Sequence, residues 1–75
     1  MDGGRIQMFI GTALRKLRTE REMSQTELGA EIQMSATTVS RWESDQMRPN
    51  VESLLKLAAF FGVPLEQLAN GRVAR

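Results

Sequence analysis

Residues 24–43 decide the fold, and they read SQTELGAEIQMSATTVSRWE. They predict two short helices, over residues 25–32 and 36–43, each preceded by a serine that can act as its N-cap. The first serine, Ser24, is followed three positions later by a glutamate, which is the spacing of a capping box. Because only about three residues connect the two helices, they must cross steeply, as they do in a helix-turn-helix.

Apolar residues recur at three- and four-residue steps on both sides of this pair, which predicts further helices over residues 6–21 and 51–61. Gly62 ends the later helix in the manner of a C-cap, and a fifth helix follows between Pro64 and Asn70. No segment alternates with period two, so no strand is predicted. The predicted fold class is therefore all-α, a compact domain of five short helices.

The same spacing predicts the core. In the central pair, Gly29 is the small residue where the two helices touch, and five larger residues are buried around it. These are Leu28, Ile32, Met34, Val39 and Trp42. The helix at 51–61 contributes an apolar stripe, which consists of Val51, Leu54, Leu55, Ala58 and Phe61.

Length and composition limit the organisation of the chain and its function. The 75 residues suffice for one small domain with a thin core. We expect this domain to span residues 6–71, between a flexible tail at residues 1–5 and a short basic tail at residues 72–75. The chain holds no cysteine and no histidine, which excludes disulfides, thiolate metal sites and histidine-based catalysis. We therefore expect no enzyme activity, no metal and no cofactor.

Charge and hydropathy narrow the choice of partner. No apolar run approaches the ~20 residues of a membrane-spanning helix, and the amino end lacks a secretory pattern. A cytoplasmic protein without a membrane partner is the expectation. The net charge is only +1, so an anionic partner must be met by a local patch and not by the field of the whole molecule.

The outward face of the helix at 36–43 is such a patch. At about 100° per residue, with Val39 facing the core, the side chains of Thr37, Ser40, Arg41 and Ser44 point outward. This face is small, polar and free of negative charge, and it carries one arginine. A DNA major groove accepts a helix with such a face, and an arginine there can bond guanine bidentately. A plain solvated helix face is the alternative explanation.

Five segments carry a resemblance to a known family. They are LRKLR at 14–18, MSQTEL at 23–28, VSRWE at 39–43, RPN at 48–50 and LLKLA at 54–58. In order and spacing they resemble the lambdoid phage repressor type of helix-turn-helix domain, over about residues 6–71. The resemblance implies a compact five-helix domain that binds double-stranded operator DNA, as a homodimer on a palindromic site.

The resemblance also implies roles for single residues. Four match positions that contact bases, the third of them in only some members: Ala36, Thr37, Ser40 and Arg41. Six match positions that contact phosphate: Arg18, Gln25, Ser35, Thr38, Arg48 and Asn50. Arg18 and Glu43 further match a pair that joins the first helix to the end of the third. For Arg18, a purely structural ion pair is an open alternative to a phosphate contact.

Two positions depart from the family's pattern. Gln33 stands where the family usually has glycine, and a left-handed backbone without glycine costs about 1 kcal/mol. We therefore expect the turn to relax and to shift the aim of the helix that follows. Ser44 and Asp45 stand where a glycine commonly follows the glutamate of the third helix. Aspartate tolerates a left-handed backbone, but we expect its charge to keep this loop from approaching phosphate closely.

Two functions of different classes remain open. The first is a sequence-specific transcriptional regulator, namely a repressor. The second is a protein-interaction module with the same fold, such as an antitoxin or adaptor. The modest net charge favours the protein-interaction module. Phe9 and Phe60 favour it too, because they lie off the apolar stripes and one or both are predicted to be exposed. We also predict a small dimer contact in the region of the fourth and fifth helices. No small-molecule substrate is expected.

Overall fold

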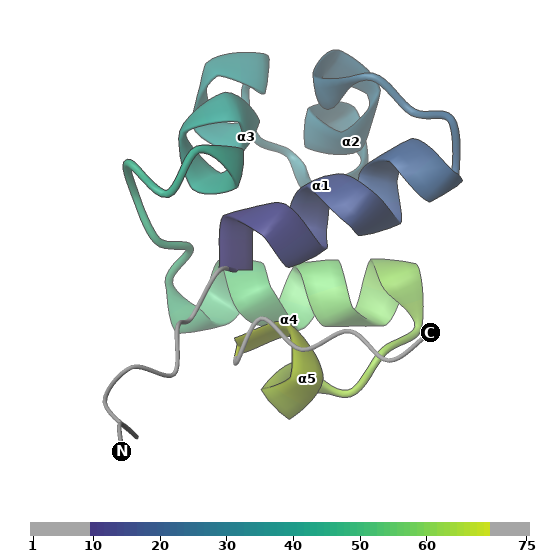
Figure 1. Ribbon diagram of the computed structural model, residues 1–75, viewed down its shortest axis with the longest axis vertical. Helices are drawn as coiled ribbons and strands as arrows, with labels where there is room; N and C mark the ends of the chain where they lie inside the picture. The colour runs from purple at the N-terminus through teal and green to yellow at the C-terminus, as the bar shows by residue number, and fades with distance from the viewer. Residues whose placement is uncertain (1–9, 70–75) are drawn as a thin grey trace.

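Five helices surround one apolar core in the computed structural model, which describes residues 10–69 (Figure 1). Their bounds are α1 Ile10–Glu20, α2 Gln25–Ile32, α3 Ala36–Glu43, α4 Val51–Phe61 and α5 Leu65–Ala69. These bounds confirm the predicted all-α fold of five helices. The predicted start of the first helix at residue 6 and both predicted tails lie outside the described residues. No helix within residues 10–69 is long and apolar enough to cross a membrane.

The helices are arranged in tiers. α2 and α3 lie side by side at one end of the molecule, and α1 runs across beneath them (Figure 1). α4 packs against α2 and against α5, which lies at the opposite end of the molecule and also contacts α1. Within residues 10–69, no other helix covers the outer sides of α2 and α3 (Figure 1).

The predicted N-caps are confirmed. Ser24 Oγ accepts the backbone N–H of Glu27 at 3.0 Å, while a carboxylate oxygen of Glu27 accepts the N–H of Ser24 at 2.8 Å, so the capping box is complete. Ser35 Oγ and Asn50 Oδ1 likewise accept the backbone N–H three residues on, at 3.1 and 2.8 Å. Each such cap contributes about 1 kcal/mol, which matters for helices of only two or three turns.

The turn between α2 and α3 corrects one expectation. Gln33 adopts the left-handed conformation, with φ 64° and ψ 44°, so the turn does not relax in the absence of glycine. The tight turn is kept because the N–H groups of Gln33 and Met34 both donate to the carbonyl of Gly29. Gly29 itself lies against the turn, since a Cβ there would collide with the carbonyl oxygen of Met34. The small residue predicted at the contact is confirmed, but what it touches is the turn's own backbone.

A second close approach, which the sequence analysis missed, joins α1 to the end of α3. A Cβ at Gly11 would lie 2.6 Å from the carbonyl oxygen of Trp42 and would also collide with that of Glu43. The N–H of Gly11 donates to Asp45 Oδ1 at 3.1 Å, and Asp45 is left-handed with φ 61°. The carboxylate of Asp45 thus binds at the N-terminal end of α1, where the helix dipole favours negative charge.

The core contains the predicted residues of the central pair, and Trp42 is only 2% exposed. Met34 is half-buried and packs against this core. The buried cluster consists of Leu14, Leu17, Leu28, Ile32, Val39, Trp42, Leu57, Ala58, Phe61 and Leu68.

The predicted stripe of α4 is wrong in part. Val51 and Leu55 are 67% and 52% exposed, while Leu57, which the stripe omitted, is fully buried. α4 faces the core with Leu54 and the residues three, four and seven positions later, which is also an amphipathic spacing. Because this helix is apolar over most of its length, periodicity alone allowed more than one orientation about its axis.

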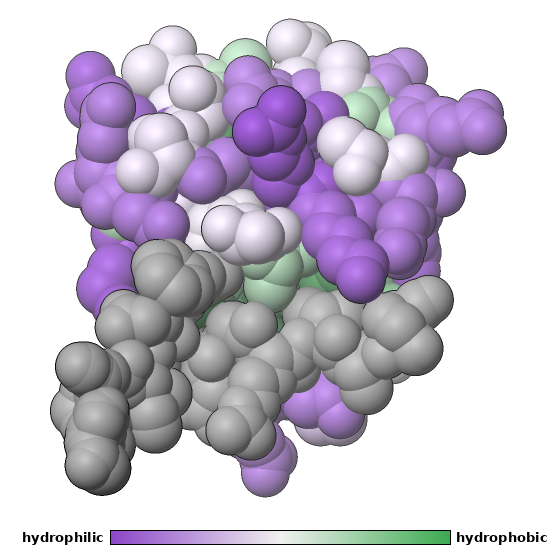
Figure 2. Space-filling view, viewed as in Figure 1, coloured by the Kyte–Doolittle hydropathy of each residue, from purple (hydrophilic) through white to green (hydrophobic). Residues whose placement is uncertain are grey.

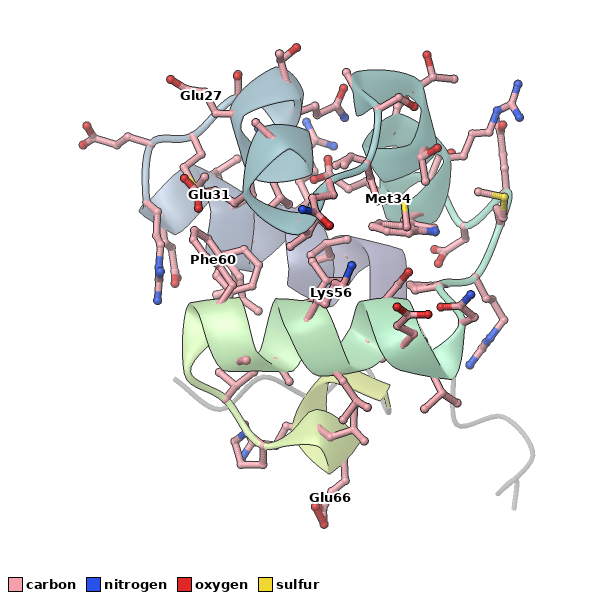
Figure 3. The ribbon with its side chains drawn as sticks, turned by 180° about the vertical axis from the view of Figure 1, so that it is seen from behind. Glu27, Glu31, Met34, Lys56, Phe60 and Glu66 are labelled. Carbon is pink, nitrogen blue, oxygen red and sulfur yellow. The ribbon has the colours of Figure 1, made fainter. Side chains whose placement is uncertain are left out.

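Phe60, one of the two phenylalanines of which one or both were predicted to be exposed, is half-buried. Figure 3 shows its ring on the side of α4 that faces α1 and α2. The guanidinium of Arg21 lies 5.2 Å from its centroid and 5.0 Å from that of Phe61. The same guanidinium donates to the carbonyls of both phenylalanines, at 3.2 and 3.1 Å, so Arg21 joins the end of α1 to the C-terminal end of α4. The other predicted exposed ring, Phe9, lies outside the described residues.

The left-handed turn leads to a stability prediction. Replacing Gln33 with glycine should raise the free energy of unfolding by up to about 1 kcal/mol, because glycine adopts positive φ without a steric penalty but loses more entropy on folding. Urea unfolding followed by circular dichroism measures the change. Gln33→Ala is the matched control, and it should give no gain because alanine keeps a Cβ. Equal stabilisation by both variants would contradict this explanation.

Candidate nucleic-acid interface

The outer side of α3 presents a hollow of about 310 Å³. Its lining includes all four residues predicted to contact bases, namely Ala36, Thr37, Ser40 and Arg41. Thr37, Ser40 and Arg41 are exposed, and Ala36 is half-buried at the start of the helix. In Figure 2, hydrophilic and neutral residues cover this end of the molecule, where α2 and α3 lie. The hollow therefore offers hydrogen-bonding groups and one cation on a protruding helix.

Two glutamines border this hollow. Gln25, from the first turn of α2, was predicted as a phosphate contact, whereas Gln46, from the turn after α3, was not predicted at all. The N–H of Gln46 donates to the carbonyl of Arg41 at 2.9 Å, which folds the turn back beside α3. The left-handed backbone conformation of Asp45 makes this reversal possible. The sequence held a signal for this turn, because Ser44 and Asp45 stand where the family commonly has a glycine.

A second hollow, of about 280 Å³, opens between α1, α2 and α3. Its lining consists of Arg15, Arg18, Gln25, Ser40, Glu43 and Ser44. Two of these residues, Gln25 and Ser40, also line the first hollow, so the two are adjacent.

Glu43 is the centre of a hydrogen-bond network in this second hollow. Its Oε2 accepts from Arg18 Nε at 2.6 Å, and its Oε1 accepts from Arg18 Nη2 and from Gln25 Nε2, both at 3.0 Å. The third nitrogen of Arg18, Nη1, donates to the carbonyl of Met23 at 2.7 Å. The two charged side chains are only 12% and 5% exposed, for Arg18 and Glu43 respectively. Hydrogen bonding to Glu43 raises the pKa of Arg18 above its ordinary value, so the guanidinium of Arg18 stays protonated.

The predicted ion pair between Arg18 and Glu43 is therefore present. The phosphate contact that was also predicted for Arg18 remains a prediction. All three nitrogens of Arg18 donate inside the protein, and Nη1 and Nη2 each keep a second hydrogen. Gln25 donates a hydrogen bond to Glu43 through one of its two amide hydrogens. Its second amide hydrogen can therefore still be donated to a phosphate.

The other four predicted phosphate contacts line neither hollow. Ser35 and Thr38 bind each other at the start of α3, where Ser35 Oγ donates to Thr38 Oγ1 at 3.1 Å. Arg48 and Asn50 are exposed in the connection from α3 to α4, and Asn50 caps α4. Their predicted roles are compatible with these positions but remain predictions.

The acidic residues of α2 lie away from both hollows. Glu27 and Glu31 are about 200° and 240° around the helix from Gln25. Figure 3 shows both on the side of α2 that is turned away from α3. Negative charge on α2 is thus separated from the polar face of α3.

Known proteins share this architecture. A 38% identical relative over 64 residues is the HTH-type transcriptional activator BcrR of Enterococcus faecalis; the match covers 85% of this chain and 31% of that protein. A 35% identical relative over 62 residues is the cryptic phage CTXphi transcriptional repressor RstR of Vibrio cholerae, with 83% and 56% covered. The chain thus spans less than two thirds of the length of either relative.

Solved structures agree with this similarity. The P22 c2 repressor in complex with a synthetic operator superposes with a TM-score of 0.81 at 28% identity, over 87% of this chain and 98% of that one. The DNA-binding domain of the P22 c2 repressor in solution gives 0.77 at 28% identity, over 84% and 83%. The helix-turn-helix family matches residues 14–68, which is most of the chain and includes every helix at least in part. The chain belongs to the helix-turn-helix family.

Proposed function

We propose that this chain is a sequence-specific DNA-binding transcriptional regulator without catalytic activity, and that it acts as a repressor. The observation that carries the proposal is the outer face of α3, where three small side chains and one exposed arginine border a hollow. Such a face matches the edges of bases in the major groove. The relatives support regulation of transcription, although one is named an activator and the other a repressor.

In this proposal α3 lies in the major groove. Arg41 bonds a guanine bidentately, Thr37 and Ser40 bond further base edges, and Ala36 contacts a thymine methyl group. The phosphate contacts are those predicted from the sequence, made by Arg18, Gln25, Ser35, Thr38, Arg48 and Asn50. They orient the domain and supply much of its affinity. Both relatives come from bacteria, where DNA lies in the cytoplasm, and we place this protein there too.

We further propose that the protein binds a palindromic operator as a homodimer. A twofold dimer uses the same surface on both copies. The large apolar side chains that are exposed within residues 10–69 are Met47, Val51 and Leu55, which lie on α4 and on the connection before it. We therefore assign the dimer contact to this patch, which covers the fourth-helix part of the region that the sequence predicted around the fourth and fifth helices.

Selection of binding sites from a random duplex pool tests the function. At roughly 150 mM salt, which screens loose phosphate attraction, we expect enrichment of a palindrome with half-sites about one helical turn apart. Binding that shows no enrichment and disappears as salt rises would contradict sequence-specific regulation. In that case a protein partner, as in an antitoxin or adaptor, becomes the better explanation of the exposed apolar patch.

Substitution of Arg41 tests how α3 reads bases. Arg41→Ala should cost about 1–3 kcal/mol on the selected site, because a bidentate pair is lost, while nonspecific affinity changes little. Titrations of the selected site and of a scrambled duplex measure the two effects. Arg48→Ala is the control, since loss of a phosphate contact should weaken both duplexes equally. If Arg41→Ala also weakens both equally, Arg41 binds phosphate and the assignment is wrong.

Substitution of the apolar patch tests the dimer. A Val51→Ser and Leu55→Ser double variant should keep its fold, because both side chains are largely exposed, but should lose cooperative binding to the palindrome. Sedimentation with the palindrome and with a single half-site measures the stoichiometry. Ala30→Ser, at an exposed position of α2 that lines neither hollow, is the control for adding a hydroxyl. Unchanged cooperativity in the double variant would place the dimer contact elsewhere.

A further inference from the structure

We propose that Arg15 binds a backbone phosphate of DNA, in the hollow between α1, α2 and α3, together with Gln25 and the hydroxyl of Ser40. This inference rests on the proposed function and names a contact that neither the motifs nor the family resemblance pointed to. It adds Arg15 to the phosphate contacts proposed above, on the same helix as Arg18.

The charges of the hollow carry the first step. Two arginines and one glutamate line it. Glu43 forms hydrogen bonds with two nitrogens of Arg18, so these two charges neutralise each other. The net positive charge of the hollow is therefore that of Arg15. Arg15 is exposed, and no salt bridge joins it to any residue between 10 and 69.

The hydrogen-bond donors carry the second step. Both oxygens of Glu43 already accept from side chains, so its carboxylate is engaged inside the protein. Gln25 Nε2 keeps one hydrogen for a ligand, and Ser40 brings a hydroxyl to the rim. The hydroxyl of Ser44, also in the lining, donates instead to the carbonyl of Arg41 at 3.3 Å. An arginine fork with amide and hydroxyl donors is a set that suits a phosphate oxygen.

The position of the hollow carries the third step. It shares Gln25 and Ser40 with the hollow on the outer face of α3, where the bases are proposed to be read. A phosphate in the second hollow would therefore belong to the strand that borders the groove. Contact there fixes the register of α3 on the duplex without itself reading sequence.

Salt dependence of binding tests this contact, with Lys16 as the matched control. Lys16 is the next residue of α1 and equally exposed, but about 100° around the helix, and it lines neither hollow. We would titrate wild type, Arg15→Gln and Lys16→Gln with a mixed-sequence duplex of ~20 bp at roughly 50 to 200 mM salt. Both substitutions remove one positive charge, so they alter the long-range field alike.

Arg15→Gln should reduce the slope of log K against log salt by about 0.9 per bound protomer and weaken binding roughly tenfold at 0.1 M salt, because one phosphate contact is lost. Lys16→Gln should change the slope by much less. Arg15→Lys, which keeps the charge without the fork, should retain most of the slope.

The other outcomes separate the two proposals. Equal slopes for wild type and Arg15→Gln, or equal losses in Arg15→Gln and Lys16→Gln, would overturn the phosphate contact while leaving DNA binding in place. Failure of the wild type to bind any duplex would overturn the proposed function and this contact with it. Because the side chain of Arg15 is exposed, the variants should unfold at the same urea concentration as wild type, which shows that folding is not the cause.

Discussion

One carboxylate, that of Glu43, determines how the three helices of the interface sit together. It lies in the last turn of α3 and accepts hydrogen bonds from Arg18 of α1 and Gln25 of α2. Arg18 in turn binds the carbonyl of Met23, just before α2 begins. Removing one partner of a buried ion pair costs ~3–5 kcal/mol, because the other charge is left without compensation. The orientation of α3 therefore depends on a charge pair between its own last residue and Arg18, which lies 25 positions earlier in the sequence.

Such external support is necessary because α3 has only eight residues. A helix of two turns does not hold its shape in water without packing. Val39 and Trp42 supply the apolar part of that packing. Gly11 supplies another part, since it lets the start of α1 touch the carbonyls that end α3. Because packing fixes both the inner side and the end of α3, its outer face can carry small polar residues, although these residues are poor helix formers.

The interface also separates two kinds of contact. The outer face of α3 carries hydrogen-bonding groups with a single cation, which suits discrimination between bases. The rim between α1 and α2 carries arginine and amide donors, which suits attraction to the phosphate backbone. The internal pairing of Arg18 with Glu43 sharpens this division, because it removes one arginine from the charge that faces outward. The small net charge of the chain is thus no obstacle to binding an anion.

The sequence by itself determined the helices, their caps and the central pair, because these depend on neighbours within four residues. Ser24, Ser35 and Asn50 cap their helices as their spacing indicated. Thr37, Ser40 and Arg41, which were placed on the outer face of α3, line one hollow. Only the tertiary structure decided which side of α4 is buried and that Gln46 and Arg15 belong beside the interface. It also decided that Gln33 keeps a left-handed turn. These features depend on packing between segments that are distant in sequence, or on hydrogen bonds to backbone carbonyls. The periodicity of apolar residues along the chain carries no information about such packing or such hydrogen bonds.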